Sequence, residues 1–210
     1  MRIFAIELST KMGSVAVVED GVVIVEDRWE ETFKNRQRLF DALGALNVDW
    51  DSIDLFAAGR GPGAFSGMRI AFTVINALAA PTKKPVYALN SGAALAARIG
   101  AAKTAVVGDA RRDKVWAGVF SGTELEKEFE LMERDALKDF VPADARVVSP
   151  DQERLAELLA DFDGMTEPAY PSAGTLGELV HRRVENGIAT EPFEPLYMHP
   201  PVFIAPRFPA

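Results

Sequence analysis

The sequence predicts an α/β protein. Three short apolar runs open the chain, at residues 2–8, 13–19 and 22–28, and tight turns separate them, with Asp20-Gly21 a strong hairpin signal. Farther along, runs of strand length alternate with stretches of helical periodicity. One of these alternations passes through a glycine-rich connection at residues 59–67. Antiparallel strands followed by alternating strands and helices indicate mixed sheets flanked by helices.

Composition limits the classes of function. A chain of 210 residues can bury a sizeable core, as one domain or as two small lobes. With 23 Lys and Arg against 31 Asp and Glu, the net charge is −8, so the surface as a whole should repel nucleic acid. The absence of cysteine excludes disulfides, iron–sulfur clusters and thiol catalysis. No apolar run is long enough to span a bilayer and no signal-peptide pattern is present, so we expect a cytoplasmic protein without membrane association.

The glycine-rich connection joins a predicted strand at 53–58 to a predicted helix at 71–80. Gly61, Gly63 and Gly67 allow positive φ and a close approach of the backbone to another object. A helix beginning near Gly67 would direct free amide groups at whatever lies above the loop, and an anion would suit that position. The spacing is neither a Walker A sequence nor G-x-G-x-x-G. Two interpretations therefore stand side by side, a phosphate cradle and a tight connection shaped only by backbone geometry.

The helix after this loop is apolar almost all round from Met68 to Ala80. A sheet covers only one face of a helix, so another helix of the chain or a second protein must cover the other. A second predicted helix, at 34–46, is amphipathic. We predict a partner-binding surface on these two helices, with these candidate residues: Leu39, Leu43, Met68, Phe72, Ile75 and Ala79.

Three stretches carry a resemblance to a known family. Residues 61–70, Gly-Pro-Gly-Ala-Phe-Ser-Gly-Met-Arg-Ile, resemble the G-P-G-S-F-T-G-L-R-I-G stretch of the TsaB (YeaZ-like) family, bacterial proteins of tRNA threonylcarbamoyladenosine synthesis. Residues 109–116 resemble its D-A-R-R-x-E-V-Y, and residues 194–198 its closing E-P-x-Y-L-R, with His199 in place of the usual Arg. The resemblance implies a two-lobed actin/hexokinase/Hsp70-like fold (ASKHA, RNase H-like), with lobes expected at 1–102 and 103–210.

That fold makes ATP or ADP a candidate ligand of the cleft between the lobes. Its first hairpin holds a phosphate through a carboxylate followed by small hydroxyl residues, which are Glu7, Ser9 and Thr10 in this chain. The family usually has Asp at the first of these positions. Its second hairpin faces the cleft with Asp109 and Arg111. The alternative is that these residues only form turns, one of them a solvated charged turn.

By resemblance, the chain is a non-catalytic partner of TsaD, which transfers a threonylcarbamoyl group to the adenosine beside the anticodon. A TsaE-like ATPase would join the heterodimer, the chain would form a homodimer when alone, and tRNA would be contacted only indirectly. The equivalent helix of TsaD carries a metal-binding H-x-x-x-H pair, whereas residues 34–46 contain no histidine. His181 and His199 lack ligand spacing, so we expect no metal site and no catalytic residue. The alternative is an ATP-binding phosphotransferase or hydrolase that uses Glu7 or Asp109.

Overall fold

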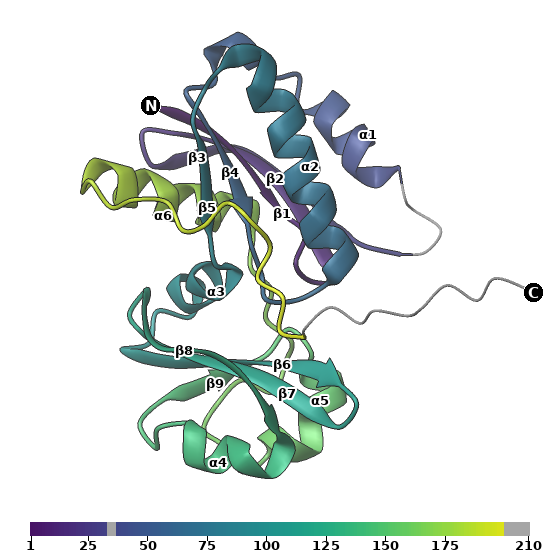
Figure 1. Ribbon diagram of the computed structural model, residues 1–210, viewed down its shortest axis with the longest axis vertical. Coiled ribbons are helices and arrows are strands. Elements are labelled where there is room, and N and C mark those ends of the chain that lie inside the picture. The colour runs from purple at the N-terminus through teal and green to yellow at the C-terminus, as the bar shows by residue number, and fades with distance from the viewer. Residues whose placement is uncertain (33–36, 200–210) are drawn as a thin grey trace, which may run out of the picture.

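The computed structural model describes residues 1–32 and 37–199 and contains two sheets with helices around them (Figure 1). The first part of the chain contains β1 (Arg2–Glu7), β2 (Met12–Glu19), β3 (Val22–Glu30), α1 (Arg38–Ala45), η1 (Trp50–Ser52), β4 (Leu55–Gly59), α2 (Phe65–Thr82), β5 (Val86–Leu89) and α3 (Ser91–Ile99). The second part contains β6 (Lys103–Arg111), β7 (Lys114–Ser121), β8 (Glu124–Glu133), η2 (Arg134–Ala136), α4 (Leu137–Phe140), β9 (Arg146–Val148), α5 (Gln152–Leu159) and α6 (Ala173–Glu185).

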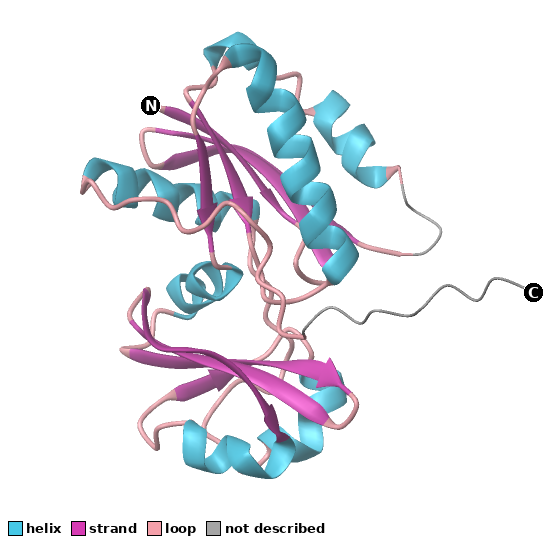
Figure 2. Ribbon diagram, in the orientation of Figure 1, coloured by secondary structure: helices cyan, strands magenta, loops and turns pink. Residues whose placement is uncertain are grey.

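The first sheet has the strand order β3-β2-β1-β4-β5. Strands β1, β2 and β3 pair antiparallel through the predicted tight turns. Strand β4 pairs parallel to β1, and β5 pairs parallel to β4. Helices α1 and α2 pack on one face around Phe4, Ile6 and Phe56. Helices α3 and α6 pack on the other face around Ile3 and Leu89. Figure 2 shows this sheet between its two helical layers.

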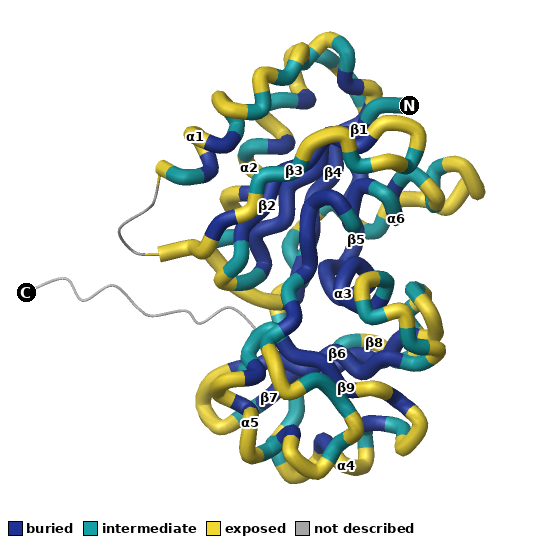
Figure 3. Tube along the Cα trace, turned by 180° about the vertical axis from the view of Figure 1, so that it is seen from behind, coloured by how far each residue is buried: buried dark blue, intermediate teal, exposed yellow. Residues whose placement is uncertain are grey.

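The second sheet has the order β8-β7-β6-β9 and lies below α3 in Figure 1. Its outer face packs on α4 and α5 through residues such as Val107, Leu137 and Leu155. Its inner face contributes Trp116 and Phe120 to the same core as α3 and the first sheet. Helix α3 therefore lies between the sheets as a buried middle layer, as the dark blue trace in Figure 3 shows.

The expected lobe range 103–210 needs a correction, because α6 packs on the first sheet. The amide of Ala173 donates to Ser14 Oγ at 2.8 Å, and the amide of Gly174 donates to Glu26 Oε1 at 2.8 Å. A Cβ on Gly177 would touch the side chain of Val18 on β2. The two sheets do divide near residue 103, but the chain returns to the first lobe at α6. The proline-rich end at 200–210 lies outside the described residues.

Two helix boundaries differ from the sequence expectation. Helix α2 begins at Phe65 rather than near Gly67, with Ala64 as N-cap. The amide of Ala64 donates to the carbonyl of Ser9 at 2.6 Å, which fixes the chain at the point where the helix can begin. Helix α1 is described from Arg38, and residues 33–36 of the predicted helix at 34–46 lie outside the described residues. Within the described parts of the chain, no helix has the length and apolar character that crossing a membrane requires.

Gly67 gives a test of how tightly α2 packs on the first hairpin. A Cβ on Gly67 would overlap the carbonyl oxygen of Leu8, whereas a Cβ on Gly44 of α1 would meet nothing within 4 Å. We expect Gly67→Ala to lower the free energy of unfolding by about 1–3 kcal/mol through overpacking. The control Gly44→Ala should leave it unchanged or raise it by up to about 1 kcal/mol, because Ala favours helix more than Gly. Urea unfolding followed by circular dichroism measures both, and equal effects would contradict the packing argument.

Candidate functional site: a cleft between the lobes and an exposed helix face

A cleft of about 1070 Å³ opens between the lobes. Each lobe contributes a turn to its walls. The first lobe adds the glycine loop with the start of α2, the second lobe adds the start of α5, and the chain after α6 contributes a fifth segment. The main lining segments are 8–11, 63–68, 109–111, 150–154 and 196–199. The cleft therefore combines parts of the chain that are far apart in the sequence.

The structure brings most of the predicted phosphate residues to this cleft. Six of them line it: Ser9, Thr10, Gly63, Gly67, Asp109 and Arg111. The Thr10 hydroxyl donates to the carbonyl of Met12 at 3.1 Å and so takes part in the turn itself. The buried Ser9 hydroxyl has no hydrogen-bond partner among the described residues. Gly61 and Glu7 do not line the cleft.

Glu7 lies inside the first lobe with none of its surface exposed. Its carboxylate accepts hydrogen bonds from the amide of Ser9 at 2.7 Å and from Ser91 Oγ at 2.6 Å. Ser91 Oγ in turn accepts from the amide of Gly61 at 3.0 Å. Burial raises the pKa of the Glu7 carboxyl, because the charged form loses its hydration. Glu7 thus ties the end of β1 to the glycine loop and to the start of α3, and it does not face a ligand in the cleft.

The glycine loop is pressed against the turn between β1 and β2. A Cβ on Gly63 would overlap the carbonyl oxygen of Ser9, and a Cβ on Gly67 would overlap that of Leu8. Gly61 has a φ of 89°, a backbone conformation that favours glycine. These contacts account for all three glycines by backbone geometry, whether or not an anion binds above them.

The charged side chains on the second-lobe side of the cleft already have partners. Asp109 lies 3.3 Å from Arg111 Nη1 and 3.7 Å from Arg154 Nη1. Its amide donates to Asp151 Oδ2 at 3.0 Å. Burial, and then the neighbouring charge of Asp109, raise the pKa of Asp151.

The residues at the cleft do not fit a nucleotide triphosphate well. On the first-lobe side, Lys11 pairs with Glu153 across the cleft at 3.3 Å, so this cation too is already matched by a carboxylate. The carboxylates of Asp109 and Asp151 also line the cleft, and their negative charge would repel phosphate there. The carboxylate predicted to begin the phosphate site, Glu7, is bonded inside the lobe.

The residues predicted for a partner surface are mostly buried in the first lobe, which corrects their assignment. Leu39, Met68, Phe72, Ile75 and Ala79 are between 0% and 6% exposed. Leu43 is partly buried against the same core. The reason is geometric. Positions 68, 72, 75 and 79 follow the helical repeat that forms one stripe, and that stripe packs on the sheet.

The exposed apolar side chains of these helices are different ones, which the sequence reasoning missed. Phe40 of α1 is 64% exposed, and Phe65 and Ile70 of α2 are 55% and 46% exposed. For Phe40 and Ile70 the signal was present in the sequence, because both lie off the stripe that a sheet-packed helix must bury. Phe65 continues the buried repeat by one turn but is the first residue of α2, and it remains exposed there. All three also line the cleft, so the exposed helix face and the cleft are continuous.

The segment after α6 contributes residues that sequence reasoning did not assign. We call residues 188–199 the strap. The ring of Phe193 packs on Phe72, with centroids 4.6 Å apart, and Tyr197 packs on Phe65 at 4.9 Å. His199 Nε2 lies 2.7 Å from the carbonyl oxygen of Ala110 on β6. The strap thus crosses the start of α2 and ends against the second lobe.

Comparisons with known proteins indicate the family and the fold of the chain. The family model described as "TsaD: tRNA N6-adenosine threonylcarbamoyltransferase" matches residues 37–171. The tRNA threonylcarbamoyladenosine biosynthesis protein TsaB of Escherichia coli (strain K12) is 30% identical over 141 residues. This match covers 60% of the chain and 61% of that relative, so it spans about three-fifths of the relative's length.

Two solved structures from Pseudomonas aeruginosa are similar over nearly their whole length. One is described as an uncharacterized protein with similarity to peptidase YEAZ. It has a TM-score of 0.81 and 26% identity, with 94% of this chain and 99% of that chain covered. The other, YeaZ, has a TM-score of 0.77 and 26% identity, with 93% and 100% covered. Together with the two sheets described above, these likenesses confirm the predicted two-lobed actin-like α/β fold.

The raised pKa of Glu7 predicts a pH dependence of stability. Above the ordinary value of 4.5 the unfolded chain loses this proton while the folded chain keeps it, so the free energy of unfolding falls as pH rises. We expect Glu7→Gln to remove this loss of stability at high pH, because the amide of Gln carries no titrating proton. The variant should therefore be more stable than the wild type at pH 8, and its free energy of unfolding should depend less on pH. Urea unfolding between pH 4.5 and pH 8 measures the difference. Glu128→Gln on the exposed side of β8 is the control and should reproduce the wild-type curve.

Proposed function

Because the chain belongs to the family that the TsaD model describes, and within it to the TsaB (YeaZ-like) proteins of tRNA threonylcarbamoyladenosine biosynthesis, we propose that it acts as a non-catalytic partner of a TsaD-like protein. The observation that carries the proposal is the exposed apolar face of α1 and α2, formed by Phe40, Phe65 and Ile70. Such side chains gathered on one face of a protein mark an interaction site more often than isolated exposed residues do.

The inward stripe of α2 leaves its outward face free for a second protein. Arg69, Thr73, Asn76 and Ala77 are exposed along that face, and they are small or only moderately polar apart from Arg69. Helices with short side chains on an outward face can pack closely against a helix pair of another protein. The same surface could close on a second copy, so the proposal includes a homodimer when the partner is missing.

A non-catalytic role is supported by the acidic residues predicted for the cleft, because their carboxylates are already hydrogen-bonded or paired with arginine. The Glu7 carboxylate is bonded inside the first lobe, and Asp109 is matched by Arg111 and Arg154. The net charge of −8 favours contact with tRNA through the partner rather than through this chain. The proposed complex acts in the cytoplasm on the adenosine next to the anticodon. A TsaE-like ATPase joins the heterodimer.

An ATP-dependent phosphotransferase or hydrolase is the second candidate. The volume of the cleft favours it, since about 1070 Å³ is large enough for a nucleotide. Titration calorimetry of the purified chain with ATP and ADP tests it. If the chain binds ATP or ADP, Arg111→Ala should weaken the affinity at least about tenfold, because one charge-assisted hydrogen bond is lost. Such a result would favour this candidate.

The exposed helix face predicts which substitutions disrupt partner binding. We expect Phe40→Glu combined with Ile70→Glu to abolish association with a TsaD-like protein, because two charges would be buried without partners at the interface. Light scattering coupled to gel filtration, on the chain alone and in the mixture, measures the complex.

The matched control is Val22→Glu combined with Ile24→Glu. These residues are also exposed, at 61% and 54%, but they lie on the edge strand β3 and, unlike Phe40 and Ile70, do not line the cleft. The control should bind as the wild type does. Loss of the complex in the control, with binding intact in the helix variant, would reject the proposed surface.

A further inference from the structure

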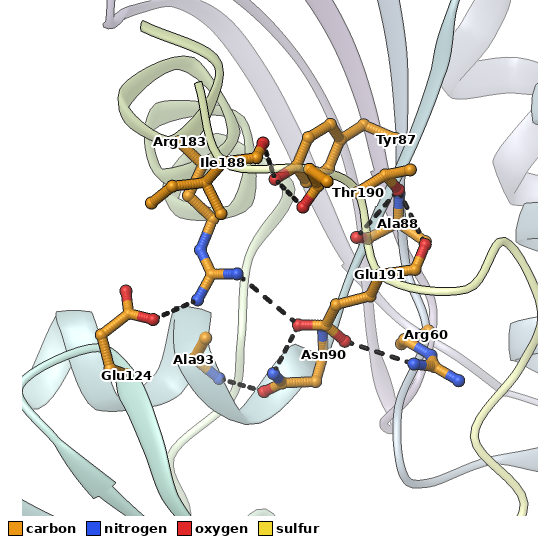
Figure 4. A network of polar contacts seen from close by, with 11 residues as sticks. Arg60, Tyr87, Ala88, Asn90, Ala93, Glu124, Arg183, Ile188, Thr190 and Glu191 are labelled. Carbon is orange, nitrogen blue, oxygen red and sulfur yellow. Dashed lines mark hydrogen bonds and ion pairs between the residues drawn. The ribbon is translucent and has the colours of Figure 1, made fainter. Parts of the chain in front are cut away.

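The carboxylate of Glu191 in the strap gathers donors from three other elements (Figure 4). It accepts from the amide of Asn90 at 3.1 Å and from Asn90 Nδ2 at 2.9 Å. Arg60 Nη1 lies 3.4 Å away, and Arg183 Nη1 lies 3.9 Å away. The Glu191 side chain is 21% exposed and both guanidinium side chains are 11% exposed, so solvent screens these ion pairs less than it screens surface pairs.

Each donor belongs to an element that shapes the cleft or joins the lobes. Arg60 follows β4 and opens the glycine loop, and Asn90 is the N-cap of α3, where its side chain accepts from the amide of Ala93 at 2.8 Å. Arg183 of α6 also pairs with Glu124 of β8 at 3.0 Å. Through Arg183, the Glu191 carboxylate is linked to the second sheet as well as to the first lobe.

Backbone contacts hold the strap on either side of Glu191. Before it, the Tyr87 hydroxyl lies 3.0 Å and 2.9 Å from the carbonyl oxygens of Ile188 and Ala189. Glu191 itself donates its amide to the carbonyl of Ala88 at 3.2 Å. These contacts dock the first part of the strap on β5, as Figure 4 shows.

After Glu191, the strap is held by Arg60. Arg60 Nε donates to the carbonyl of Glu194 at 3.1 Å, and the amide of Leu196 donates to the carbonyl of Arg60 at 2.7 Å. One residue of the glycine loop therefore bonds both the Glu191 carboxylate and the part of the strap that leads to Tyr197.

From this convergence of donors we propose that Glu191 is the latch of a strap that forms one wall of the cleft. While Glu191 is bonded, residues 196–199 line the cleft and Tyr197 and Phe193 cover part of Phe65 and Phe72. Loss of the Glu191 contacts removes the charged anchor of the strap. The bonds between Arg60 and the backbone of Glu194 and Leu196 remain, as do the two ring contacts, but they hold the strap less tightly, so it separates from α2 more often. When it separates, the cleft widens and the apolar start of α2 becomes more exposed. The Glu191 latch therefore controls how much of this surface is accessible.

Hydrogen exchange on the full chain tests the latch. We expect Glu191→Ala to speed amide exchange in residues 188–199 by about tenfold or more, because the strap loses its bonds to a charged group. Strands β1, β4 and β7 should exchange as in the wild type. Binding of an apolar fluorescent dye should rise in the same variant as Phe65 and Phe72 are uncovered.

Glu194→Ala is the matched control. Glu194 lies three residues farther along the strap, is exposed, and contributes its carbonyl rather than its side chain to the contact with Arg60.

Added formate distinguishes a latch from a general loss of stability. A small carboxylate can enter the space left in Glu191→Ala and meet the same donors, so we expect formate to restore slow exchange in the strap. Chloride at equal ionic strength should restore it less. Unchanged exchange in the strap would overturn the proposal. So would faster exchange throughout both sheets, or an equal effect of Glu194→Ala.

Discussion

The glycine loop lies directly against the turn between β1 and β2, with no room for a side chain at Gly63 or Gly67. This contact fixes where α2 begins, and the bonds from Glu7 through Ser91 to Gly61 hold the loop from behind. The near edge of the cleft and the direction of α2 therefore depend on one backbone-to-backbone approach. Ordinary side chains at these glycines would separate the loop from the turn and move both the cleft edge and the helix.

Helix α2 serves the fold and the surface with different residues. Phe72 and Ile75 fill the space above the first sheet, while Phe65 and Ile70 remain exposed beside the cleft. When the chain is alone, part of the apolar area of this helix stays in contact with water, which is unfavourable in free energy. A partner that covers the exposed helix face would remove this unfavourable contact.

The last part of the chain returns to the first lobe and ties the molecule together. Helix α6 covers the face of the first sheet opposite α2, and the strap then runs along β5 to the cleft. The polar contacts of Glu191 and Arg183 join this segment to α3 and β8. The shape of the cleft is thus set by residues more than a hundred positions apart in the sequence, such as Arg60 and Glu191.

Local pattern by itself determined the α/β class, the strands with their tight turns, and the glycine connection before a long helix, because periodicity and turn chemistry act over a few residues. The glycine pattern indicated Gly63, and the family resemblance indicated Ser9 and Asp109; all three line the cleft. Only the tertiary structure decided that Glu7 is internal, that Phe72 is buried while Phe40 is exposed, and that α6 belongs to the first lobe. These outcomes depend on which face meets which sheet and on contacts between distant segments, and no short stretch of sequence contains that information.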